Sequence, residues 1–65
     1  MKIYTCDYAI TSPDTVIDLI EHAFYGATAC WGNIDDDRFE VTVFGILGEQ
    51  VDELDDVMAP YLWED

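Results

Sequence analysis

A proline at position 13 fixes the boundary between the first two structural elements of this chain. Ser12 can cap a helix, Pro13 suits its first position, and Asp14 faces the positive end of the helix dipole. A helix should therefore start at Pro13. Its apolar stripe, at spacings of three and four, consists of Val16, Ile17, Ile20, Ala23 and Phe24, and Gly26 is placed to end it.

Three segments have the composition of strands. Residues 2–10 are rich in Ile, Tyr and Thr, and residues 38–46 alternate apolar and polar side chains until a glycine breaks the pattern. Residues 27–34 predict a weaker strand, because a glycine and an asparagine dilute it. Three consecutive aspartates, residues 35–37, indicate the tip of a hairpin between the last two strands.

A second helix is expected over residues 49–59, where Pro60 should stop it and leave residues 61–63 as an apolar tail that packs back on the domain. The predicted order is β-α-β-β-α. We therefore expect a single α+β domain over residues 1–65, with a three-stranded antiparallel sheet and two helices over one face. A helix on each face is the competing arrangement. The inward stripe of the second helix consists of Val51, Leu54, Val57 and Met58.

Acidic side chains outnumber basic ones by fifteen to two, which gives a formal net charge of −13. Solubility requires much less, because a net charge of about 2–8 is enough for a small domain. Self-repulsion destabilises a compact state, and a 65-residue fold has little stability to spare. The excess of negative charge therefore favours a functional role for the acidic side chains. Nucleic acid and anionic membranes are disfavoured as direct partners because they would be repelled, so a basic protein is expected.

The acids form three clusters in which no Lys or Arg interleaves on either helix. Neighbours at i and i+4 on a helix lie about 5–6 Å apart, a spacing similar to that of phosphates along a nucleic-acid strand. A channel lined with Lys and Arg could accept such rows in place of its own ligand. The clusters are Asp14, Asp18 and Glu21 on the first helix, Asp35, Asp36 and Asp37 at the hairpin tip, and Glu49, Asp52, Glu53, Asp55 and Asp56 on the second helix.

The residues that enzymes use are scarce. The chain has one histidine, His22, and two cysteines, Cys6 and Cys30, with neither a Gly-rich phosphate loop nor metal-ligand spacing. We expect no enzymatic activity, no cofactor and no metal, and we expect both cysteines to be reduced core thiols. No apolar run reaches the length of a membrane span, and residues 1–10 lack the basic start of a signal peptide. A cytoplasmic location in a bacterial host cell is expected.

A short, acidic chain with carboxylate rows on its helices resembles the small anti-defence proteins of bacteriophages, such as anti-CRISPR proteins and DNA mimics that block restriction enzymes. The resemblance covers size, charge and layout, and no sequence motif carries it. It implies a stoichiometric inhibitor of a nuclease complex, with a type I CRISPR effector as the favoured target. The expected partner-binding residues are the three acidic clusters together with Tyr25 and Trp31 as aromatic anchors.

Other interpretations stay open at this point. An exposed acidic helix face is usually only a solvated face, and acidic surfaces also suit proteins adapted to high salt. A regulatory or adaptor module, similar to an antitoxin, could bind a basic partner through an apolar face, with its charge serving solubility. A homodimer could also form, because Trp31, Phe44 and Trp63 are large apolar groups for a fold of 65 residues to bury.

Overall fold

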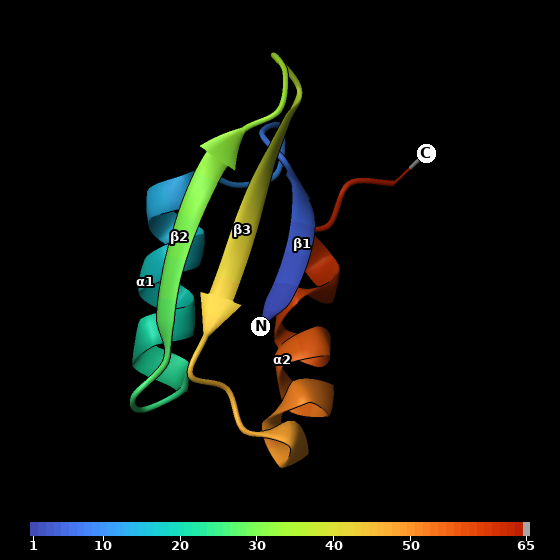
Figure 1. Ribbon diagram of the computed structural model, residues 1–65. Helices are drawn as coiled ribbons and strands as arrows, with labels where there is room; N and C mark the ends of the chain where they lie inside the picture. The colour runs from blue at the N-terminus through green and yellow to red at the C-terminus, as the bar shows by residue number, and fades with distance from the viewer. Residues whose placement is uncertain (65) are drawn as a thin grey trace.

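The computed structural model describes residues 1–64 and confirms the predicted order of elements (Figure 1). Short 3-10 turns at Gly48–Gln50 and Ala59–Tyr61 flank the second helix. The predicted second helix therefore divides into three pieces, and its α-helical part is shorter than expected. The elements are β1 (Lys2–Asp7), α1 (Pro13–Ala23), β2 (Thr28–Asn33), β3 (Arg38–Phe44) and α2 (Val51–Met58).

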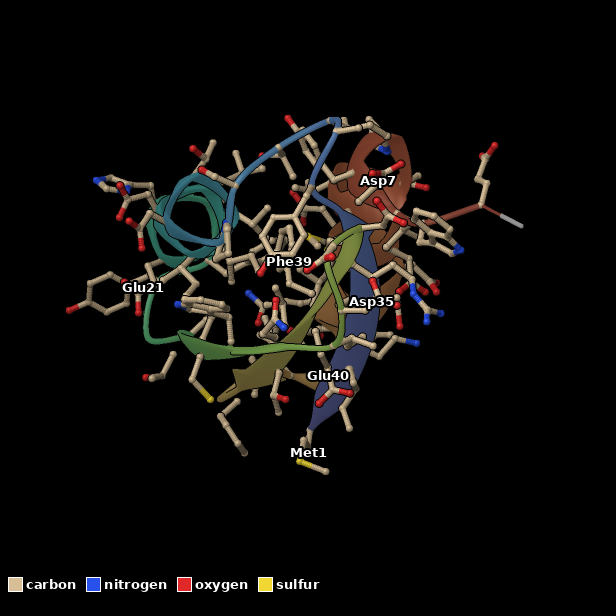
Figure 2. The ribbon with its side chains drawn as sticks, turned by 90° about the horizontal axis from the view of Figure 1, so that it is seen from above. Met1, Asp7, Glu21, Asp35, Phe39 and Glu40 are labelled. Atoms are coloured by element: carbon tan, nitrogen blue, oxygen red, sulfur yellow. The ribbon has the colours of Figure 1, made fainter. Side chains whose placement is uncertain are left out.

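The three strands form one antiparallel sheet in the order β1-β3-β2. Val41 in the central strand lies opposite Tyr4 of β1 and Trp31 of β2, so these three side chains project from the same face. Both helices cover this inner face, while Glu40 projects from the opposite side (Figure 2). The arrangement with two helices over one face is confirmed, and the alternative with a helix on each face is wrong.

The core lies between the inner face of the sheet and the two helices. Val16 and Ile20 of α1 and Leu54 and Met58 of α2 are buried, as their helical spacing predicts. They pack in one cluster with Tyr4, Cys6, Ala29, Phe39, Val41 and Val43 of the strands.

The end of α1 differs from the prediction. Ala23 is exposed, because the helix ends there and does not present it to the core. Phe24 adopts an extended backbone conformation (φ −126°, ψ 101°) and is buried. At the other end Ser12 occupies the N-cap position, but its Oγ lies 2.8 Å from Oγ1 of Thr15 and makes no capping bond to a backbone N–H.

The first strand ends at Asp7, three residues before the predicted end. Asp7 Oδ1 accepts a hydrogen bond from the N–H of Ala9 at 2.8 Å, and its carbonyl accepts from Ile10 and Thr11 at 3.1 and 3.2 Å. An aspartate that bonds to the backbone two residues later forms a turn, and this turn ends the strand.

The apolar tail packs back on the domain, as predicted. Leu62 forms an isolated bridge with Cys6, and the N–H of Trp63 donates to the carbonyl of Thr5 at 2.9 Å. The Arg38 guanidinium lies 5.5 Å from the centre of the Trp63 ring. The tail therefore covers the outer edge of β1.

Gly45 is required where β3 ends, which supplies a test of the fold. Its φ is +77°, and a Cβ added there would lie 2.8 Å from the carbonyl oxygen of Gly26. Gly26 also has a positive φ, +85°, but open space around it. We expect Gly26→Ala to lower the free energy of unfolding by about 1 kcal/mol and Gly45→Ala by about 2–3 kcal/mol. Urea denaturation of both variants measures the difference, and equal losses would contradict the close approach of the two loops.

Candidate acidic interface

The α1 row consists of Asp14, Asp18 and Glu21, which the structure confirms as exposed residues of one helix. At about 1.5 Å of rise per residue the row extends for about 10 Å along α1. Asp14 lies in the first turn, where the helix dipole favours a negative charge. Glu21 lies near the C-terminal end, where the dipole disfavours it. Only one end of the row therefore stabilises the helix that carries it.

The hairpin cluster, Asp35, Asp36 and Asp37, divides into one structural and two available carboxylates. Asp35 Oδ1 accepts the backbone N–H groups of Asp37 and Arg38, both at 2.9 Å. Its Oδ2 accepts Nε and Nη2 of Arg38 at 2.9 and 2.6 Å. The hydrogen bonds from the Arg38 guanidinium, and then the bond from the backbone N–H of Asp37, hold the pKa of Asp35 below its usual value. Asp36 and Asp37 are exposed.

The α2 cluster, Glu49, Asp52, Glu53, Asp55 and Asp56, also has one member turned toward the fold. Asp55 Oδ1 accepts the hydroxyl of Tyr4 at 2.6 Å and lies 3.5 Å from Nζ of Lys2. The Tyr4 hydrogen bond and then the charge of Lys2 lower the pKa of Asp55. Sequence reasoning missed this role, because the pairing partners lie about fifty residues apart. The other four members are exposed.

The Tyr4 hydrogen bond can be tested through Asp55. Tyr4→Phe should raise the pKa of Asp55 toward the ordinary carboxyl value, because the largest cause of its depression is lost. A depressed pKa contributes stability above the unfolded value of about 3.9, and this stability is lost as pH falls through the folded pKa. Tyr4→Phe should therefore be less stable than the parent near pH 7, and the gap should close in acid.

The measurement is an NMR titration of the side-chain carboxyl carbons, combined with urea denaturation at several pH values. Tyr61→Phe is the matched control. Tyr61 is also largely buried, but its hydroxyl has no hydrogen-bond partner in residues 1–64. An Asp55 pKa that is the same in Tyr4→Phe and Tyr61→Phe would contradict the assignment.

The two predicted aromatic anchors are accessible. Tyr25 is fully exposed and lies two residues beyond the end of α1, and Trp31 on β2 is 47% exposed. Trp31 shares the helix-covered face with Val41, but it stands on an edge strand, and about half of it stays exposed. Neither side chain belongs to the buried core, so both could contact a partner.

The cysteines and the histidine occupy different environments. Cys6 is buried, which raises the pKa of its thiol to about 11, as expected for a core thiol. Cys30 is exposed on the outer face of β2, so the expectation of two core thiols is wrong for Cys30. Alternation along a weak edge strand did not reveal which face it would occupy. His22 is exposed, with Nδ1 2.8 Å from the carbonyl oxygen of Asp18.

The three acidic clusters lie on three separate elements. Helix α1 lies beside β2, helix α2 lies beside β1, and the hairpin between β2 and β3 lies at one end of the sheet (Figure 1). The chain has a net charge of −13 along a longest dimension of 32 Å, or about one charge for every 2.5 Å. Duplex DNA carries one negative charge for about every 1.7 Å along its axis. The linear charge density thus comes within a factor of about two of that of DNA.

In the part of the chain that the structure describes, no pocket opens and no group of three or more His, Cys, Asp or Glu side chains is placed to hold a metal ion. Within the same residues, neither helix has the length and apolar character needed to span a bilayer. Comparisons of the chain with protein-family models, curated proteins and solved structures return no match.

Proposed function

We propose that this chain is a stoichiometric inhibitor that imitates nucleic acid, as an anti-CRISPR or other anti-defence protein. It occupies the basic DNA-binding channel of a nuclease complex and excludes DNA by position and charge. A type I CRISPR effector is the favoured target. In this role the chain needs no catalytic residue, cofactor or metal, because its surface is the active part.

The observation that carries the proposal is the distribution of unpaired carboxylates around the molecule. A channel that holds DNA surrounds its ligand, so a mimic should present charge on more than one element, and the proposal is supported by exposed acids on both helices and at the hairpin. The principal dimensions of 32, 19 and 17 Å describe an elongated body with charge along its length. Solubility alone requires a net charge of only about 2–8, well below the magnitude of 13 found in this chain.

The two basic side chains support the same interpretation. Lys2 pairs with Asp55 and Arg38 pairs with Asp35, and both pairs are partly exposed, so each contributes little to stability. Among residues 1–64 the other carboxylates form no ion pair. A basic partner would therefore meet a surface on which few acids are already neutralised.

The experiment measures displacement of labelled DNA from a purified type I CRISPR effector by fluorescence anisotropy, with a restriction endonuclease as a second target. We expect competitive release of DNA at a one-to-one ratio, and an apparent affinity that falls steeply as salt rises. If neither target binds the chain, capture from lysates of nuclease-bearing bacteria with a salt gradient provides other candidates. A partner that binds DNA and the chain simultaneously would contradict mimicry.

A further inference from the structure

Strand β2 is an uncovered edge of the sheet. In the order β1-β3-β2, the outer side of β1 receives Leu62 and Trp63, but no segment of residues 1–64 pairs with the outer side of β2 (Figure 1). An edge strand presents a row of backbone N–H and C=O groups that can pair with another chain.

The hydrogen-bond pattern shows which groups face outward. The N–H of Ile34 donates to the carbonyl of Arg38 at 3.2 Å, directly across the extended register of β2 and β3. Hydrogen-bonded pairs alternate in an antiparallel ladder. The backbone groups of Thr28, Cys30 and Gly32 should therefore face β3, and those of Ala29, Trp31 and Asn33 should face the open edge. The same alternation on β1 directs Thr5 outward, where Trp63 bonds to it.

The edge also lacks the charges that normally block strand pairing. Residues 22–34 contain no Asp, Glu, Lys or Arg, and this is the longest such run in a strongly charged chain. Natural edge strands are usually protected by charges, proline or bulges. Here carboxylates flank the edge instead. Helix α1 lies alongside β2, with its C-terminal turn, which contains Glu21, near the start of β2, and the hairpin cluster follows the other end of the strand (Figure 1).

Charge decides between two occupants of this edge. A second copy would bring another net charge of −13, and pairing of β2 with β2 would place a second α1 row beside the first. A basic segment would be attracted at both ends of the strand. Its lysines or arginines could reach Glu21 at one end and Asp36 at the other, while its centre needs only an extended backbone.

We propose that β2 binds an extended segment of the basic partner by strand addition, with an uncharged centre and Lys or Arg at both ends. This inference rests on the proposed function, because it describes how the partner's polypeptide contacts the mimic. Backbone pairing gives the contact a fixed orientation, which charge attraction alone does not provide. The half-exposed Trp31 would then pack against side chains of the added strand.

The test uses a fluorescent peptide of alternating valine and threonine with two lysines at each end. A second peptide has the same sequence, with every amide of its central segment N-methylated, which removes strand pairing and keeps the charge. We expect the methylated peptide to bind about tenfold more weakly or worse. Hydrogen exchange by NMR should show new protection at the amides of Ala29, Trp31 and Asn33, and little change at Thr28, Cys30 and Gly32.

Three outcomes would overturn the inference. The first is no binding of the unmodified peptide, and the second is equal binding of both peptides without protection of β2. The third is protection of β2 in the protein alone, rising with its concentration together with a doubled mass, which would identify a second copy as the occupant. Failure of DNA displacement in the effector assay bears on the proposed function separately, because the peptide assay contains neither effector nor DNA.

Discussion

Reversing the charge of exposed residues in all three clusters is expected to abolish binding to the basic partner. The variant replaces Asp18 and Glu21 in α1, Asp36 and Asp37 in the hairpin, and Glu53 and Asp56 in α2 by lysine, all of which are exposed and form no ion pair within residues 1–64. Affinity near physiological salt should fall by about hundredfold or more, because steering and counterion release are both lost. A variant with only one cluster reversed should bind the partner with an affinity between that of the full reversal and that of the parent.

A matched control separates position from net charge. Glu40→Lys combined with Glu64→Lys changes the net charge as much as one cluster variant does, but Glu40 is exposed on the outer sheet face and Glu64 is in the tail. We expect this control to bind almost as tightly as the parent. Loss of binding equal to that of a cluster variant would show that net charge alone attracts the partner. Circular dichroism should show every variant folded, since reversal relieves self-repulsion.

Much of the fold could be predicted because its signals are local. Pro13 begins α1, the alternation after Arg38 defines β3, and the three aspartates mark the hairpin. These features depend on neighbours within a few residues, which a sequence shows directly. A single apolar stripe on each helix favoured two helices over one face, but it left a helix on each face open, and only the packing of both helices into one core decides between them.

Features that depend on distant contacts could not be predicted in the same way. Asp55 resembled the other acids of its helix, but its partner Tyr4 lies on β1. Cys30 is exposed because it projects from the outer face of the sheet, which no helix covers, and the weak alternation of residues 27–34 did not show which face it would take. The turns at Asp7 and Asp35 could in principle have been predicted, because an aspartate that bonds to the backbone two residues later is a local turn signal.

Loss of the Phe39 ring is expected to unfold the domain. Phe39 is fully buried in the central strand, where it points between the two helices (Figure 2) and its ring centre lies 4.9 Å from that of Tyr8. Truncation of a buried phenylalanine to alanine costs about 3–5 kcal/mol. A single core of this size rarely supplies more than about 3–5 kcal/mol in total, so Phe39→Ala should be largely unfolded at 25 °C. Circular dichroism with urea denaturation measures the loss.

Phe44→Ala is the matched control, because Phe44 belongs to the same strand but is 43% exposed on the outer face. Its truncation should cost about 1 kcal/mol or less, since an exposed side chain leaves no cavity. Repulsion among the carboxylates destabilises the folded state of this chain. Added salt at about 1 M shortens the screening length to about 3 Å and should therefore partly restore the fold of Phe39→Ala. Equal losses of unfolding free energy in Phe39→Ala and Phe44→Ala would contradict the burial of Phe39 in the core. A Phe39→Ala variant whose stability does not respond to salt would show that repulsion among the carboxylates destabilises the fold only slightly.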